Sequence, residues 1–362
     1  MSWRQGFSFV EAAHHKVSAW RKYMRRISEV ALLARAAISL LDAADTGIRL
    51  LVAAVFLIGL TPSLGWTCAC GCGVFEVGTA SLFPQGSGGQ VWLQYEYMDQ
   101  YINFHATQPA SAFYNNDKYI RTNFMEAGVQ YMFNRDWGVM LEVPYWSRDY
   151  KGAYEGNNAD IHWYQNDSIG DIRIQGMYTG LSEDMSTGLL MGVKVPSGDW
   201  TYPPYDRDTE IGTGSTDLLM GAYHLGTFPA KLGTLPLTFR DRPFSWYVQA
   251  NYDLPLWEQD QYTPGREVDG AVGAYYDFGK VGPLNELAPM LTFLASDRTR
   301  DTGNNAAPAD SGYTRFIVAP GGEIVFGVIR AYADIEVPIF QNMRGLQLTA
   351  PFATKLIVSY SF

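Results

Sequence analysis

The final residues of the chain, 355–362 (KLIVSYSF), carry the pattern that decides the fold class. Apolar side chains stand there at every second position: Leu356, Val358, Tyr360 and Phe362. Successive side chains of a strand point to opposite faces, so this spacing predicts a strand with one apolar and one polar face. Such a strand separates an apolar medium from a polar one.

The same two-residue rhythm runs through the chain from residue 90 onward. It predicts strands at 91–97, 126–134, 139–145, 172–178, 189–195, 217–226, 246–254, 272–278, 287–296, 314–320, 322–338 and 348–362. About twelve strands result, an even number, as single-chain bacterial barrels have. The expected fold is therefore all-β: a transmembrane antiparallel up-and-down β-barrel, preceded by a helical leader or signal segment.

In a membrane barrel the apolar side chains face lipid and the polar side chains face the lumen. Inward-pointing polar side chains are therefore expected at Arg173, Gln175, Lys194, Gln249, Asn251 and Asp253. A soluble β-sandwich would instead bury the apolar set in a core, and the period alone does not separate the two folds. The chain has 14% aromatic residues, including 23 Tyr and 10 Trp. This content favours the barrel, because these rings prefer the membrane–water interface.

The end of the chain also indicates a location. An alternating strand that closes on Tyr360 and Phe362 resembles the recognition signal by which outer-membrane barrels are handed to their insertion machinery. It implies the bacterial outer membrane, with the lipid bilayer and that machinery as partners. Segments rich in Asn, Asp, Gly and Pro predict long outer loops alternating with short turns, at 99–120, 148–167, 197–215, 256–265 and 297–312.

Residues 1–65 are interpreted as an extended leader with a secretory signal. The apolar run Leu50–Leu60 (LLVAAVFLIGL) follows Arg49 and is too short to cross a bilayer as a helix. A basic residue, a short apolar stretch and a small-residue end are typical of a secretory signal. Residues 1–48 have the spacing of an amphipathic helix. They are either part of the leader, with Met24 as another start, or a helix on a membrane surface.

The three cysteines, Cys68, Cys70 and Cys72, lie in a segment, 66–89, between the leader and the barrel at 90–362. Their spacing admits a soft-metal site, a lipidated cysteine or a redox-active pair. A packed or disulfide-bearing segment at the periplasmic mouth is the structural alternative. Structural zinc takes four ligands and no fourth is adjacent, so the metal interpretation is weak.

Charge argues against nucleic acid as a partner. The chain has 27 basic and 37 acidic residues, and residues 1–65 hold 8 and 4 of them, leaving 19 basic against 33 acidic. Phosphate binding needs clustered Lys and Arg, which the remaining sequence lacks.

Three motifs resemble an outer-membrane family named for the meta-pathway of phenol degradation. They are Gly170-Asp171-Ile172-Arg173, Val193-Lys194-Val195-Pro196-Ser197-Gly198-Asp199 and Ile211-Gly212-Thr213-Gly214-Ser215-Thr216-Asp217. The strand 331–338, a turn at Gln341-Asn342 and the ending 348–362 are also similar to that family. The resemblance implies a barrel that lets hydrophobic or aromatic compounds cross the outer membrane. By their residue types, the motifs themselves predict turns at strand ends.

The expected function is a passive channel or uptake porin for small solutes, including hydrophobic or aromatic ones. The alternative is a structural or surface-binding barrel that transports nothing. An enzyme is not expected, because the sequence lacks a Gly-x-Ser-x-Gly elbow and a metalloprotease helix. Ser215 and His224 are the single Ser-His pair considered, with a structural role as the favoured interpretation. No cofactor is expected.

Overall fold

A computed structural model describes residues 82–84, 86–113, 115–154, 157–205, 207–229, 231–232, 235–236, 238–239 and 242–362. The expected leader 1–65 and the cysteines Cys68, Cys70 and Cys72 lie outside the described residues. Within the described part of the chain, no helix is long and apolar enough to cross a membrane.

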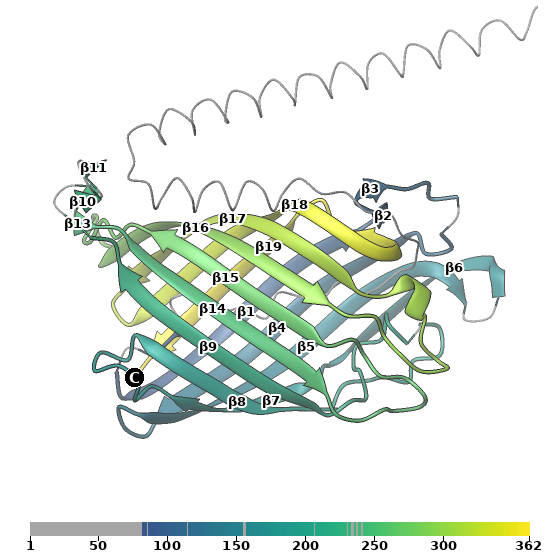
Figure 1. Ribbon diagram of the computed structural model, residues 1–362, viewed down its shortest axis with the longest axis horizontal. Coiled ribbons are helices and arrows are strands. Elements are labelled where there is room, and N and C mark those ends of the chain that lie inside the picture. Colours follow the sequence, from purple (N-terminus) through teal and green to yellow (C-terminus); the bar gives the residue numbers. More distant parts are fainter. Residues whose placement is uncertain are drawn as a thin grey trace, which may run out of the picture. The chain divides into compact units, whose positions relative to one another are not determined.

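Twelve strands form one closed antiparallel sheet, so the prediction of an up-and-down barrel is confirmed (Figure 1). In order around the barrel they are β1 (Gly88–Gln100), β4 (Tyr119–Met132), β5 (Trp137–Tyr154), β7 (Ile172–Tyr178), β8 (Thr187–Val195), β9 (Asp217–Thr227), β14 (Ser245–Pro255), β15 (Glu267–Tyr275), β16 (Glu286–Arg298), β17 (Tyr313–Phe326), β18 (Ile329–Thr349) and β19 (Ala353–Ser361). Each strand pairs with its neighbour along the chain, and β19 pairs with β1 to close the sheet.

Shorter elements decorate this barrel. They are β2 (Ile102–Ala106), β3 (Gln108–Pro109), β6 (Asn157–Ile169), β10 (Lys231–Leu232), β11 (Leu235–Pro236), β12 (Thr238–Phe239), β13 (Arg242–Pro243) and the 3₁₀ turn η2 (Pro308–Asp310). Strand β6 pairs with the outer part of β5, and β2 pairs with the end of β18. We call the barrel end that holds Phe362 the terminal end and the opposite end the loop end (Figure 1).

The closing seam brings the two ends of the barrel sequence together. Gly89 N donates to Phe362 O and Phe362 N donates to Gly89 O, both at 2.9 Å. From there the register runs without a break from Gln90 opposite Ser361 to Met98 opposite Ala353. No strand edge of the main barrel is left open at this seam, which is the condition for a β-structure to cross lipid.

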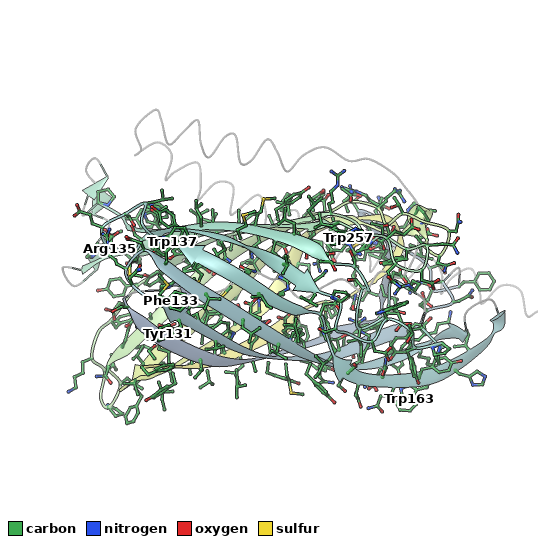
Figure 2. The ribbon with its side chains drawn as sticks, turned by 90° about the horizontal axis from the view of Figure 1, so that it is seen from below. Tyr131, Phe133, Arg135, Trp137, Trp163 and Trp257 are labelled. Atoms are coloured by element: carbon green, nitrogen blue, oxygen red, sulfur yellow. The ribbon has the colours of Figure 1, made fainter. Side chains whose placement is uncertain are left out.

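The outward face of the barrel is apolar, as the alternation predicts. Leu93, Val272 and Leu291 are each more than half exposed, whereas their inward neighbours along the strands are mostly buried. Aromatic side chains gather at both rims: Figure 2 shows Tyr131, Phe133 and Trp137 near one end of the barrel and Trp163 and Trp257 near the other. An apolar band between two aromatic rims is the surface that a membrane barrel presents to lipid.

Two predicted boundaries near the end of the chain are wrong. Gln341 and Asn342 do not form a turn, because they lie within the long strand β18. The predicted break at Pro320–Gly322 lies inside β17, and the true turn is at Gly327, whose φ is 62°. Glycine at 321 marks a close approach between strands: a Cβ there would meet Ala333 O at 2.5 Å.

The predicted loop 148–167 is also wrong, since most of it is the hairpin of β5 and β6, which extends beyond the other strands in Figure 1. Polar residues on both faces hid its strand pattern, as expected for a hairpin in contact with water on both sides. Of the other predicted loops, 99–120 contains the short strands β2 and β3, and 196–216, 256–266 and 299–312 lie at the loop end as predicted. One connection at the terminal end, 228–244, is longer than the predicted short turns.

The lipid-facing band can be tested with Leu93→Arg. We expect this change to lower the free energy of unfolding by about 2–4 kcal/mol, because it places a guanidinium in hydrocarbon. The measurement is urea unfolding of protein refolded into phospholipid vesicles. Glu183→Arg, at an exposed position in the 179–186 turn, is the control and should change it little. Equal effects of the two substitutions would contradict the assignment of the band.

Candidate functional site

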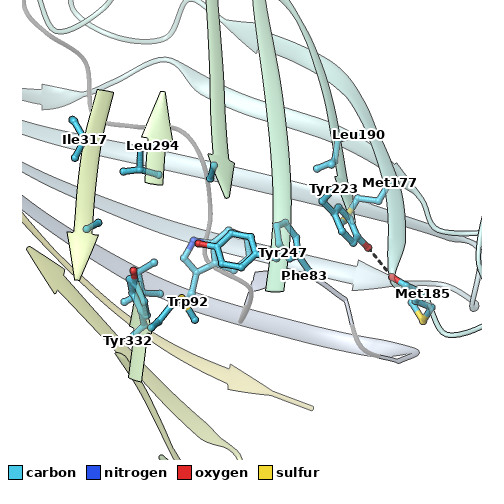
Figure 3. Close-up of a cluster of buried hydrophobic side chains, with 14 of the residues drawn as sticks. Phe83, Trp92, Met177, Met185, Leu190, Tyr223, Tyr247, Leu294, Ile317 and Tyr332 are labelled. Carbon is cyan, nitrogen blue, oxygen red and sulfur yellow. Dashed lines mark hydrogen bonds between the residues drawn. The ribbon is translucent and has the colours of Figure 1, made fainter. Parts of the chain in front are cut away.

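The lumen towards the terminal end is filled with side chains, most of them apolar, beside the polar Gln90, Gln130, Glu323 and Arg330. Figure 3 shows part of the cluster that the apolar side chains form, with Trp92, Tyr247 and Tyr332 among its large rings. Its buried members on the barrel wall and in one turn are Trp92, Met132, Met177, Met185, Leu190, Tyr223, Tyr247, Ala271, Met290, Leu294, Ile317, Ala319, Tyr332 and Ile357. These inward side chains pack against one another as one cluster. The terminal half of the lumen is therefore a packed aromatic and methionine-rich zone.

Glycines on the neighbouring strand let the large rings lie flat on the wall. A Cβ at Gly128 would fall 1.9 Å from the Trp92 ring, and one at Gly273 would fall 2.0 Å from the Tyr247 ring. Any other residue at these two positions would push the ring towards the barrel axis. The pairs of ring and glycine thus keep the width of the lumen.

Phe83, from the segment before β1, enters this zone. Its ring stacks on Tyr223 with centroids 4.2 Å apart and 10° between the planes, and it meets Tyr247 edge-on at 6.1 Å (Figure 3). Offset or edge-on packing of this kind is the favoured geometry for aromatic rings. A cavity of about 230 Å³, lined by Phe83, Arg330 and Phe362 among others, remains at the terminal mouth.

The six residues predicted to line the lumen lie on β7, β8 and β14. Arg173, Gln175, Lys194 and Gln249 are buried, and Asn251 and Asp253 are partly buried. Four of the six, Gln175, Arg173, Gln249 and Asn251, line one cavity of about 50 Å³ together with Trp92 and Phe83. Their role in a solute path stays a prediction.

Ion pairs join the predicted residues into a cluster, here called the Arg173 cluster: Arg173, Lys194, Asp217 and Asp253. The Arg173 guanidinium lies 3.3 Å from an Asp253 oxygen, and the Lys194 ammonium lies 3.5 Å from the same oxygen. Lys194 also pairs with Asp217 at the start of β9. Buried charges need such partners, because an unpaired one would cost several kcal/mol.

A second charged group, the Lys355 cluster, consists of Lys355, Glu96, Glu336 and Asp334. The Lys355 ammonium lies 2.9 Å from a Glu336 oxygen and 3.6 Å from a Glu96 oxygen. Asp334 stands opposite Lys355 in the sheet and accepts a 2.6 Å hydrogen bond from the Tyr332 hydroxyl. Sequence reasoning missed this cluster, although Lys355 and Glu96 fall on the polar faces of predicted strands.

The three family-like motifs converge at the loop ends of β7, β8 and β9. Asp171 accepts hydrogen bonds from Gly198 N at 3.0 Å and from Thr213 N and Oγ1 at 2.9 and 2.8 Å. The Ser197 hydroxyl donates to Gly170 O and accepts from Ile172 N, at 2.9 Å each. The motifs therefore form one hydrogen-bonded unit that fixes the start of the loop 196–216.

That loop folds over the lumen. The Tyr205 hydroxyl donates to Arg148 O at 2.5 Å, and the Arg148 guanidinium donates to Thr209 O and Glu210 O. Arg207 lies between the rings of Trp200 and Tyr262, 5.1 and 4.5 Å from their centroids. We call the segment 196–216 the lid loop.

A buried aspartate connects the other two outer loops. Asp301, fully buried in the loop 299–312, accepts hydrogen bonds from Gly265 N at 2.7 Å, from the Tyr262 hydroxyl at 3.0 Å and from Arg298 at 2.9 Å. Because Tyr262 also contacts Arg207, the three loops form one connected cover over the loop end.

The remaining sequence candidates are separated or exposed. The Ser215 hydroxyl donates to Asp217 and Trp257 O, whereas His224 shares a 2.7 Å hydrogen bond with Thr187, so this Ser-His pair is not brought together. Tyr360 and Phe362 are exposed on the outer wall and stack with centroids 6.1 Å apart. Their part in membrane insertion stays a prediction.

No protein-family model matches the sequence, and no curated protein matches it. Among solved structures, a crystal structure of an outer membrane channel from Pseudomonas putida F1 has a TM-score of 0.56 at 10% identity, covering 79% of this chain and 100% of that chain. The β domain of a Bordetella autotransporter has a TM-score of 0.47 at 11% identity, covering 76% and 100%. The first likeness shows that this chain has the fold of an outer-membrane barrel.

The lid loop is expected to respond to pH through Glu210. Burial raises the pKa of its carboxyl to about 8, whereas an exposed Glu titrates near 4.3. The closed lid loop therefore binds the Glu210 proton more tightly than the open loop does. This proton stabilises the closed lid loop fully below about pH 4.3, and the stabilisation is lost as the pH rises through about 8. Hydrogen exchange of residues 196–216 should be faster at pH 9 than at pH 5 after correction for intrinsic rates. Glu210→Gln should abolish this difference and Glu258→Gln, exposed on a neighbouring loop, should not.

The Arg173 cluster can be tested with Asp253→Asn. This change removes the carboxylate shared by Arg173 and Lys194, so we expect a loss of about 3 kcal/mol in the free energy of unfolding. Urea titration in vesicles measures the loss. Asp260→Asn, at an exposed position in the loop 256–266, should be neutral. A neutral Asp253→Asn would show that the cluster does not stabilise the barrel.

Proposed function

We propose that this chain is a passive channel of the bacterial outer membrane for small, largely apolar solutes. The observation that carries the proposal is a closed barrel whose lumen changes along its length. Towards the loop end it holds the Arg173 and Lys355 clusters and is covered by loops, and towards the terminal end it is lined mostly with aromatic and methionine side chains beside the Arg330–Glu323 pair. A solute that leaves water at the loop end would meet a surface suited to apolar groups.

The outer surface supports the location. A closed barrel with an apolar band between aromatic rims satisfies every requirement for a β-structure in lipid. The outer membrane channel from Pseudomonas putida F1 has the same fold. The family resemblance of the three motifs, with its implied transport of hydrophobic or aromatic compounds, agrees with this proposal.

The division of the chain belongs to the same proposal. Residues 1–65 would be removed on export, 66–89 would lie at the periplasmic mouth, and 90–362 would form the barrel. The insertion machinery would read the strand that ends in Tyr360 and Phe362. Phe83 lies inside the lumen against Tyr223, so its ring would border the solute path.

A barrel that transports nothing is the competing function. Its filled lumen would serve only stability, and its three joined outer loops would form a binding surface. The two functions differ in what happens when the lumen is emptied: a channel gains flux and a structural barrel only loses stability.

Phe83→Ala provides this test. Removing the ring that stacks on Tyr223 joins its volume to the adjoining cavity, so we expect solute flux into vesicles to rise several-fold. The measurement is uptake of benzyl alcohol, with conductance in planar bilayers as a second reading. Phe113→Ala, exposed in an outer loop, is the control. No flux through either the wild type or Phe83→Ala would leave the structural barrel as the function.

A further inference from the structure

The two charged clusters face each other across the lumen. The Arg173 cluster is on β7, β8, β9 and β14, and the Lys355 cluster is on β1, β18 and β19. In the ring of strands, β4 and β5 separate them on one side and β15 to β17 on the other. A solute travelling between the loop end and the apolar zone therefore passes between them.

Carboxylates on the intervening strands connect the clusters. Glu126 on β4 interacts electrostatically with Arg173 of one cluster and Lys355 of the other, and it accepts a 3.2 Å hydrogen bond from the Trp92 indole. Glu142 on β5 stands opposite Arg173 in the sheet and lines the cavity of about 50 Å³. Together these residues form a belt on the lumen wall.

The belt has more acidic than basic groups. Its carboxylates are Glu96, Glu126, Glu142, Asp217, Asp253, Asp334, Glu336 and, on β15, Asp269; its basic groups are Arg173, Lys194, Lys355 and, on β17, Arg315, which lines a cavity with Glu96 and Glu336. Eight carboxylates against four basic groups give the belt a net negative charge. Nearer the terminal end, Arg330 pairs with Glu323 at 2.8 Å and leaves this balance unchanged. In a narrow lumen such a charge attracts cations and repels anions.

The cavity beside the belt also prefers a hydrogen-bond donor. The Gln249 side chain lines it, is 94% buried and has an oxygen that accepts no hydrogen bond within the described part of the chain. A buried acceptor without a donor is costly, and an ammonium N–H would satisfy it. Trp92, Met177 and Leu190 line the same cavity and offer contact to an apolar group.

We propose that the channel selects by charge as well as by polarity, favouring cations that carry an apolar group, such as aryl ammonium ions, over anions of the same size. The negative belt would hold the ammonium and the aromatic zone beside it would hold the ring. A protonated amine near an aromatic face gains a further attraction from the ring. This inference rests on the proposed channel function and names the class of solute.

Benzylammonium and benzoate provide a matched pair of solutes, because they share a ring and differ in charge. Benzylammonium chloride or potassium benzoate replaces KCl on one side of a planar bilayer. The reversal potential measured with each salt gives the permeability of its organic ion. We expect benzylammonium to exceed benzoate by at least about tenfold, given the net belt charge. Equal permeabilities, or a preference for benzoate, would overturn the inference.

Isosteric variants assign the effect to the belt. Glu142→Gln should lower the permeability ratio by about fivefold, the change expected from a unit charge about 8 Å from the ion path in water. Gln175→Glu, in the same cavity, should raise it. Glu183→Gln, exposed outside the lumen, should leave it unchanged. Heat-dependent migration in gels confirms that each variant is folded.

The outcomes separate the two proposals. If potassium, chloride, benzylammonium and benzoate all carry no current, the channel function is overturned and the charge selection with it. Current without a preference between benzylammonium and benzoate would leave the channel and overturn the charge selection. A preference that none of the belt variants changes would also overturn the assignment to the belt.

Discussion

The constraint on which this structure depends is that every backbone N–H and C=O in lipid needs a partner within the protein. An open sheet fails this condition at its two edges, so the first and last strands must pair. Here the seam between β1 and β19 meets it, with reciprocal bonds between Gly89 and Phe362 at its end. For a given number of strands, the register at which the sheet closes sets the tilt of the strands and the width of the lumen.

Because the barrel is closed, the alternating apolar and polar residues of each strand lie on two different surfaces. The apolar set meets lipid, and the polar set lies inside the barrel, where most of its members are buried. The protein accommodates the polar set by pairing charges, as Lys355 does with Glu336 and Glu96. It also sets rings against glycines, as Tyr247 does against Gly273. The result is a lumen with an apolar half, a charged belt and a cover of loops, and this gradation is what a selective path for small solutes requires.

The outer cover shows how a few buried polar groups order long loops. Asp171 joins the ends of three strands, and Asp301 joins two further loops through backbone and side-chain donors. Each aspartate accepts several hydrogen bonds, which satisfy its charge away from water. Ordering loops of this length costs much conformational entropy. These hydrogen bonds offset that cost, so the cover has one arrangement.

The sequence by itself determined the class of fold, because a period of two with an apolar face is visible in strands such as 91–97 and 355–362. It also identified Arg173, Lys194 and Asp253 as polar residues on barrel strands, and it located the motifs around Asp171 at strand ends. It misplaced the break at Pro320, because a glycine that permits close contact between strands is also a residue typical of turns. It also misplaced the turn at Gln341, which lies in a strand paired with β17. The tertiary structure alone decided that Lys355 meets Glu96 and Glu336, that Phe83 stacks on Tyr223, and that Asp171 reaches Gly198 and Thr213. These contacts join residues far apart in the chain, and their partners are set by closure and stagger of the barrel, which no local pattern encodes.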